Sequence, residues 1–166
     1  GAEIATLLHE AGFNLVLHYR HSREAAEALR AQLEATRQDS VTLVQGNLLD
    51  TSTYTHIVTQ AAKHWGRLTI LINNASSFYE TKLGEITEEH WDDLIGTNLK
   101  APLFLSQAAA PYLKVHKGCI VNIADIHAAS PLKDYPVYSI AKAGLVMLTK
   151  TLAREMGPDV RVNAVA

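Results

Sequence analysis

A tyrosine and a lysine that could transfer protons, Tyr138 and Lys142, stand four residues apart in a stretch with helical spacing. Pro136 suits the first turn of this helix, where the backbone N–H that proline lacks is not needed. Residues at i and i+4 share one face of a helix, so the ammonium is expected to lie beside the phenol. A positive charge within about 4–6 Å lowers a phenol pKa from about 10, which would suit acid–base catalysis. The alternative is a packed ring beside a solvated cation, and the spacing alone does not exclude it.

More polar side chains follow the ends of four predicted strands. They are residues 18–22, Asn47, residues 73–79 and Asp125. Asn, Ser and Asp are common in turns, which would explain one or two of these positions. Four positions at the carboxyl ends of parallel strands indicate a ligand site, because such strand ends meet at one edge of a sheet.

Strands and helices are expected to alternate along the whole chain. Apolar runs predict strands at 13–19, 40–46, 68–73, 119–124 and 160–165. Helical spacing predicts helices at 1–12, from Ser22 to about 37, 50–65, 87–114 with an interruption near Pro102, and 136–156. This alternation predicts an α/β fold, a doubly wound parallel sheet with helices on both faces (Rossmann-like), in a single domain over residues 1–166.

The composition is that of an ordinary globular protein and argues against several classes of partner. A formal charge of −2 gives no general attraction to nucleic acid or anionic membranes. No apolar run approaches 18 residues, so no membrane partner is expected. The single cysteine, Cys119, lies in an apolar strand, which fits a reducing, cytoplasmic location. The eight histidines are scattered, and His127 has no partner at metal-ligand spacing, so we predict no metal.

Several of these motifs, in this order, resemble the short-chain dehydrogenase/reductase family. They are Asn73-Asn74-Ala75, Asn98, the strand ending at Asp125, and Tyr138-x-x-x-Lys142. The resemblance implies a nicotinamide cofactor and catalytic roles for Asn98, Tyr138 and Lys142. Family members also carry a first strand, a Gly-rich loop and a C-terminal part that this chain lacks, apart from Gly1 as a remnant of the loop. We therefore expect a partial fold, an internal piece of a longer enzyme.

The turn after Tyr19 bears on which cofactor is used. An NAD-preferring fold usually has an acid here for the ribose 2′-hydroxyl, whereas a 2′-phosphate needs cations and donors. The sequence offers Arg20, His21 and Ser22 and no acid, which favours NADPH. Ser22 could instead only cap a helix. By resemblance, the other cofactor contacts are Asn47, Leu48, Asn74, Ala75, Ser76, Tyr138 and Lys142, although the family commonly has aspartate at position 47.

Within the family, three features are most similar to pteridine reductases: residues 18–22, residues 74–79, and Asp125 where most members have serine. An ionised aspartate accepts hydrogen bonds and repels a developing alkoxide, so it suits a substrate with N–H groups and a C=N bond. Phe78 could stack on a flat ring. We predict NADPH-dependent reduction of a pterin or dihydropterin, with Tyr138 supplying a proton together with Asp125 and Lys142 tuning the phenol. The predicted substrate contacts are Ser76, Phe78, Asp125 and Tyr138.

Two alternatives stay open at this point. One is reduction of another small carbonyl or imine, and the other is a non-catalytic dinucleotide sensor, which would not need the proton-transfer residues. Many relatives are homotetramers, and two helices carry more apolar residues than one sheet-facing side needs. We therefore predict a homotetramer that uses Leu103, Leu105, Val146 and Leu148.

Overall fold

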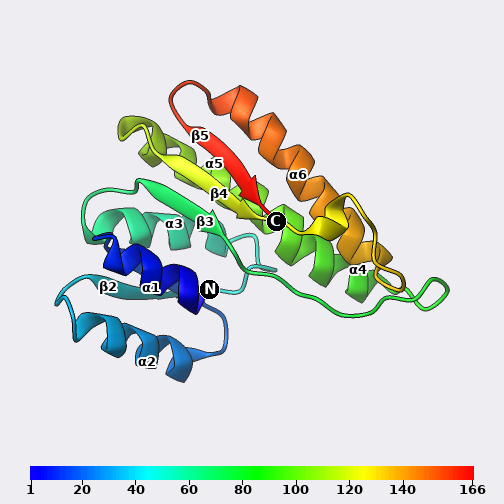
Figure 1. The fold of residues 1–166 in the computed structure, drawn as a ribbon, viewed down its shortest axis with the longest axis horizontal. Coiled ribbons are helices and arrows are strands. Elements are labelled where there is room, and N and C mark those ends of the chain that lie inside the picture. Colours follow the sequence, from blue (N-terminus) through cyan, green and yellow to red (C-terminus); the bar gives the residue numbers. More distant parts are fainter. The chain divides into compact units, whose positions relative to one another are not determined.

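The computed structural model describes all 166 residues, which form two compact units, Gly1–Gly66 and Arg67–Ala166 (Figure 1). Each unit contains one parallel sheet flanked by helices, which confirms the predicted α/β class. That all the strands belong to one sheet in one domain stays a prediction. No helix is both long and apolar enough to cross a membrane.

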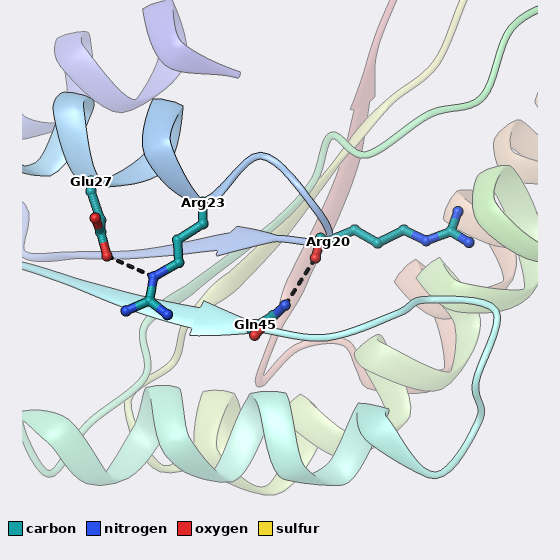
Figure 2. Close-up of polar contacts among 4 residues, drawn as sticks. All are labelled: Arg20, Arg23, Glu27 and Gln45. Carbon is teal, nitrogen blue, oxygen red and sulfur yellow. Dashed lines mark hydrogen bonds and ion pairs between the residues drawn. The ribbon is translucent and has the colours of Figure 1, made fainter.

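The first unit is a two-stranded parallel sheet between helices. Its elements are α1 (Ala2–Glu10), β1 (Leu15–Tyr19), α2 (Arg23–Glu34), β2 (Val41–Gln45) and α3 (Thr53–His64). The register pairs Leu15 with Val41 and Tyr19 with Gln45, so both strands end at the same edge. Helices α2 and α3 cover opposite faces (Figure 2). Ala5, Leu15, Leu33 and Val41 form the buried core on the side of α1 and α2.

The second unit contains a three-stranded parallel sheet in the order β3-β4-β5. Its elements are β3 (Ile70–Asn73), α4 (Glu88–Ile95), the π-helix η1 (Gly96–Lys100), α5 (Ala101–Val115), β4 (Cys119–Ile123), the 3₁₀-helix η2 (Ile126–Ala128), α6 (Pro136–Met156) and β5 (Arg161–Val165). Helix α5 packs on β3 and β4, and α6, orange in Figure 1, packs on β5. The carboxyl ends of β3 and β4 lie side by side, because Asn73 is paired with Asn122.

A chain of buried polar side chains ties this sheet to its helices. Asn73 Nδ2 donates to Asn122 Oδ1 at 2.8 Å, and Asn122 Nδ2 donates to Thr149 Oγ1 at 2.9 Å. Thr149 in turn donates to the carbonyl of Leu145 within α6. Buried polar groups need such partners, since leaving one unpaired is unfavourable. The chain thereby links α6 to β4 and, through Asn122, to β3.

The main difference from the predicted elements concerns the helix expected at 87–114. It begins at Thr87, whose side chain caps the backbone of His90. The interruption is a π-helix at Gly96–Lys100, and it lies before Pro102, not at it. Pro102 needs no break, because it lies in the first turn of α5. Short π-helical segments often occur at functional sites, and this one contains Asn98.

Candidate active site

Helix α6 carries the predicted Tyr138 and Lys142 one turn apart, close to its start at Pro136. Lys142 is only 3% exposed, and its Nζ lies 5.6 Å from the centre of the Tyr138 ring. The ammonium donates to the carbonyl of Ile123, the last residue of β4, at 2.8 Å. The pair therefore lies at the carboxyl end of β4, where the sequence predicts a site.

Asp125 is brought into direct contact with Tyr138. It follows β4 as the capping residue of η2, and its Oδ1 accepts from the backbone N–H of His127 at 2.8 Å. Its Oδ2 accepts from the Tyr138 hydroxyl at 2.8 Å. The carboxylate is thus held in a fixed orientation by the backbone while it binds the phenol.

The pKa of Tyr138 is raised well above its usual value, opposite to the lowering that the Tyr138–Lys142 spacing predicts. Burial is the largest cause, because it disfavours the phenolate, and the hydrogen bond and negative charge of Asp125 add to it. A hydrogen bond from Ser76 opposes this rise. Tyr138 is therefore protonated at neutral pH and can act as a proton donor.

The pKa values of the other two ionisable groups of the site, Asp125 and Lys142, are both lowered. Burial acts to raise the pKa of Asp125, but hydrogen bonds from the His127 N–H and the Tyr138 hydroxyl outweigh it, and the pKa lies below its usual value. Burial lowers the pKa of Lys142, and the charge of Asp125 partly offsets this. A partly buried carboxylate and a buried lysine thus both lie close to the protonated phenol.

Asn98 is almost fully buried in η1 and connects to the segment after β3. Its Oδ1 accepts from Ser76 Oγ at 2.6 Å, and its Nδ2 donates to the carbonyls of Ser77 and Leu94 at 3.0 and 2.9 Å. The family resemblance implies that Asn98 supports the lysine of the site through backbone and water. The contacts present here join it instead to Ser76, which the sequence analysis also selects.

Phe78 extends from the same segment toward Tyr138. Its ring centre lies 4.8 Å from that of Tyr138 in an edge-on arrangement and 4.7 Å from that of Tyr135, with which it stacks at 12°. The ring is still 54% exposed, so a ligand can reach it. Tyr135 was not predicted as a site residue, although an aromatic residue three positions before Tyr138 could have indicated a ring close to the site.

The other residues predicted to bind the cofactor after β3, Asn74 and Ala75, can contribute through their backbone atoms more than through their side chains. Asn74 is partly buried and Ala75 is exposed, and neither side chain makes a hydrogen bond. Asn73, just before them, points into the polar chain under the sheet, and its Oδ1 has no partner. The structure thus assigns Asn73 to the scaffold and leaves Asn74, Ala75 and Ser76 at the sheet edge.

The first unit places Arg20, His21 and Ser22 in the exposed turn between β1 and α2. Arg20 makes no ion pair. Figure 2 shows its guanidinium pointing away from the other three labelled residues, Arg23, Glu27 and Gln45. Gln45 donates to the Arg20 carbonyl at 3.2 Å, which fixes the turn to β2. Ser22 stands before α2 but its side chain makes no capping hydrogen bond, so its hydroxyl stays available.

Two carboxylates follow in α2: Glu24 in its first turn, which is exposed, and Glu27, which is bound by Arg23. Arg23 Nε donates to Glu27 Oε1 at 2.8 Å on the helix surface (Figure 2). Residues 20–22 of the turn therefore present one unpaired guanidinium and no carboxylate, and the unpaired Glu24 lies two residues farther on, in α2. Residues 20–22 fit a cofactor with a 2′-phosphate, because they offer it a charge and donors.

Asn47 and Leu48 follow β2 and differ in character. Asn47 Oδ1 accepts from the backbone N–H of Leu49 at 3.1 Å, which uses part of the acceptor capacity predicted for an adenine. Leu48 is buried, and its carbonyl accepts from the Tyr54 hydroxyl at 2.6 Å. Leu48 therefore contributes to the core of the unit and can reach a cofactor only through its backbone.

Comparisons with known proteins agree with this arrangement. A family model described as short chain dehydrogenase matches residues 1–166. The chain is 34% identical over 168 residues to the 3-oxoacyl-[acyl-carrier-protein] reductase FabG of Staphylococcus aureus (strain N315), covering 100% of this chain and 68% of that protein. It is 33% identical over 205 residues to Pteridine reductase 1 of Leishmania tarentolae, covering 100% and 71%. The chain belongs to the short-chain dehydrogenase/reductase family of oxidoreductases, which use nicotinamide dinucleotide cofactors.

Proposed function

We propose that this protein is an NADPH-dependent reductase of pterins or dihydropterins. The observation that carries the proposal is the 2.8 Å hydrogen bond from the Tyr138 hydroxyl to Asp125, with the ring of Phe78 beside Tyr138. A proton donor, a fixed acceptor for N–H groups and an exposed aromatic face thus come together. A pterin has a flat ring, N–H donors and a reducible C=N bond, and it matches all three.

In the proposed reduction of a C=N bond, Tyr138, Asp125 and Lys142 have different roles. Bound NADPH would supply a hydride for the carbon of the C=N bond. Tyr138 would give its proton to the nitrogen and be left as a phenolate, and the ionised Asp125 would accept from a neighbouring N–H of the substrate. Lys142 balances the negative charge that proton donation leaves on the phenol, and it is placed to hold the nicotinamide ribose, as the family likeness implies.

Asp125 also argues against a ketone as the preferred substrate. A carbonyl oxygen gains negative charge as hydride arrives, and an ionised carboxylate beside Tyr138 repels that charge. The low pKa of Asp125 keeps it ionised at neutral pH. A serine at this position would instead donate to the developing alkoxide.

Preference for NADPH rests on the turn between β1 and α2. The unpaired Arg20 guanidinium, with His21 and the uncapped Ser22 hydroxyl, offers a 2′-phosphate one cation and further donors. The Glu27 carboxylate is bound by Arg23, and the unpaired Glu24 lies in the first turn of α2, not at the end of β1 where an NAD-preferring fold has its acid. The cofactor preference would be carried mainly by Arg20.

Reduction of a 3-oxoacyl thioester or another small carbonyl is the second candidate. It is favoured by the identity to a relative named 3-oxoacyl-[acyl-carrier-protein] reductase, which equals that to the pteridine reductase within a percentage point. Asp125 beside Tyr138 weighs against it. A dinucleotide sensor is the third candidate, and it would need neither Asp125 nor Tyr138.

One steady-state screen separates the three candidates. The intact protein is assayed with NADPH against biopterin, dihydrobiopterin, dihydromonapterin, folate and an acetoacetyl thioester. We expect turnover of a pterin and little or none of the thioester. Turnover of the thioester alone would favour the second candidate, and NADPH binding with no turnover of any compound would favour the sensor.

We also propose that the protein is cytoplasmic and forms a homotetramer, as many relatives do. The free Cys119 is consistent with a reducing compartment. Of the residues predicted at the interface, Leu105 is buried in its own unit, so it belongs to the core instead. Leu103 on α5 and Ile140 and Met147 on α6 are the exposed apolar side chains that a partner subunit would cover.

A further inference from the structure

Three aromatic rings meet where the substrate is proposed to bind. Phe78 and Tyr135 stack at 12° with centres 4.7 Å apart, and Phe78 meets Tyr138 at 72° and 4.8 Å. The mechanism uses Tyr138 and Phe78 but gives Tyr135 no role. The Tyr135 side chain makes no hydrogen bond, so any role it has depends on its ring.

Phe78 lies in a segment, residues 74–82, that forms neither helix nor strand. A phenylalanine on such a segment needs other contacts to keep one orientation. Asn98 bonds the Ser77 carbonyl just before Phe78, and two further contacts join the segment to the residues before α6. The Thr81 backbone N–H donates to the Asp134 carbonyl at 2.8 Å, and Phe78 stacks on Tyr135, the next residue along.

Thr81, at one end of this link, is 1% exposed. Asp134, at the other end, has a φ of +67°, in the left-handed region that aspartate adopts more often than most residues other than glycine. Tyr135 directly precedes Pro136, the first residue of α6, and lies three positions before Tyr138. The Tyr135 ring therefore links the orientation of Phe78 to the helix that carries the proton donor.

We infer that Tyr135 is a positioning residue for substrate specificity: its ring holds Phe78 against Tyr138 in the orientation that a flat heterocycle needs. The inference rests on the proposed function, since it concerns the same substrate site. The Phe78 ring then already has the orientation that the substrate ring needs. Substrate binding therefore has to order little of the protein. Without Tyr135, the Phe78 ring would keep only its edge contact with Tyr138, and the substrate would have to fix the orientation of the ring.

The kinetic test compares Tyr135→Ala, Tyr135→Phe and the matched control Tyr112→Ala, which removes a partly exposed ring from α5. Because one aromatic contact corresponds to about 3- to 10-fold in affinity, we expect Tyr135→Ala to raise the KM for dihydropterin by about that factor. The kcat and the Kd for NADPH should change less than about twofold. Tyr135→Phe keeps the ring and should behave as the parent, as should Tyr112→Ala. A lower KM in Tyr135→Ala would overturn the inference, since the Tyr135 ring would then compete with the substrate.

A second measurement does not depend on turnover. Hydrogen–deuterium exchange at the Thr81 amide should be faster in Tyr135→Ala than in the parent and unchanged in Tyr135→Phe, because only the former loses the stack. Faster exchange with an unchanged KM would show a purely structural ring, and unchanged exchange would show that the stack positions nothing. Either result overturns the inference. If the parent protein reduces no pterin at all, the proposed function fails, and the exchange experiment still decides whether Tyr135 positions Phe78.

Discussion

Asp125 is the residue whose replacement best separates a pterin reductase from a ketone reductase. Asp125→Ser removes the acceptor for a substrate N–H and the partner of the Tyr138 hydroxyl, and it adds a donor for an alkoxide. We expect pterin reduction to fall by about 10²–10⁴-fold, the usual scale for a positioned proton-transfer group. Tyr138→Phe should be at least as damaging. Steady-state rates with dihydrobiopterin measure both, and reduction of an acetoacetyl thioester should rise in Asp125→Ser.

The loss must come from the site and not from misfolding. Asp125 also caps η2 through the His127 N–H, so the stability and NADPH affinity of Asp125→Ser need to be measured on the same preparation. Asp159→Ser, at an exposed position, provides the matched control and should retain full activity. An Asp125→Ser variant that folds, binds NADPH and reduces dihydropterin at the parent rate would leave the carboxylate without a catalytic part.

The pH dependence of catalysis should report the contact between Asp125 and Tyr138. Burial raises the pKa of Tyr138, and the hydrogen bond and charge of Asp125 raise it further, because a phenolate beside a carboxylate is disfavoured. Asp125→Asn removes the charge, so the pKa of Tyr138 falls. Tyrosinate absorbance should therefore appear at lower pH than in the parent, and any activity that remains should be lost at lower pH on the alkaline side. An unmoved tyrosinate titration would contradict this coupling.

The residues of this site were predictable from sequence to different extents. Tyr138 and Lys142 were found because one helical turn is a fixed local spacing. The pKa direction of Tyr138 was predicted wrongly, because burial and the Asp125 contact depend on packing that spacing does not reveal. The contribution of Tyr135 depends on a contact with Phe78, 57 positions earlier (135 minus 78), and no local pattern gives that pairing.

Among the elements, the turn between β1 and α2 allows a direct test of cofactor choice. Arg20→Asp should weaken NADPH binding by about 10- to 100-fold, the range for losing a hydrogen bond to a charged group, and should favour NADH. Arg23→Asp makes the same change three residues later, where the guanidinium is already paired with Glu27, and should have a smaller effect (Figure 2). KM values for both cofactors measure the preference. Equal effects of the two variants, or a parent that uses NADH as well as NADPH, would contradict a specific phosphate contact at Arg20.

The hydrogen-bonded side chains of Asn73, Asn122 and Thr149 should contribute to the free energy of unfolding, because they join α6 to the sheet. Thr149→Val leaves the buried Asn122 Nδ2 without its acceptor, which should lower the free energy of unfolding by about 1–3 kcal/mol. Thr151→Val is the matched control. Thr151 makes the same type of bond to the carbonyl four residues earlier but is exposed, so the change should be within about 0.5 kcal/mol. Urea unfolding of both variants gives the comparison, and equal losses would show that the Asn122 contact adds nothing.

Element boundaries were largely readable from the sequence, because Gly, Pro and capping residues act locally. Thr87 and Pro136 mark the starts of α4 and α6 in this way. The π-helix at Gly96–Lys100 was not predicted, since Pro102 was the only visible reason for a break. The Asn98 side chain bonds the Leu94 carbonyl and reaches Ser77 in another segment, and this tertiary arrangement has no pattern in the local sequence.

For the molecule as a whole, alternation of apolar strands and amphipathic helices was enough to predict the α/β class. A helix that connects two neighbouring strands of one sheet lets those strands run parallel. The sheets of both units are parallel. Alternation does not reveal which apolar residues face outward. Leu105 and Met147 both occur in apolar helices, yet Leu105 is buried and Met147 is 61% exposed. Only the exposed apolar residues are therefore available for contacts between subunits.

A tetramer would remove those exposed residues on α5 and α6 from water. Burying an apolar side chain of this size contributes about 1.5–3 kcal/mol, whereas burying an unpaired carboxylate is strongly unfavourable. Met147→Glu should therefore shift the protein from tetramers toward smaller species in sedimentation velocity at micromolar concentration. Gln60→Glu adds the same charge at an exposed position on α3 and should leave assembly unchanged. A parent protein that sediments as a monomer would remove the basis for the proposed tetramer, and the exposed Leu103, Ile140 and Met147 would then need another partner.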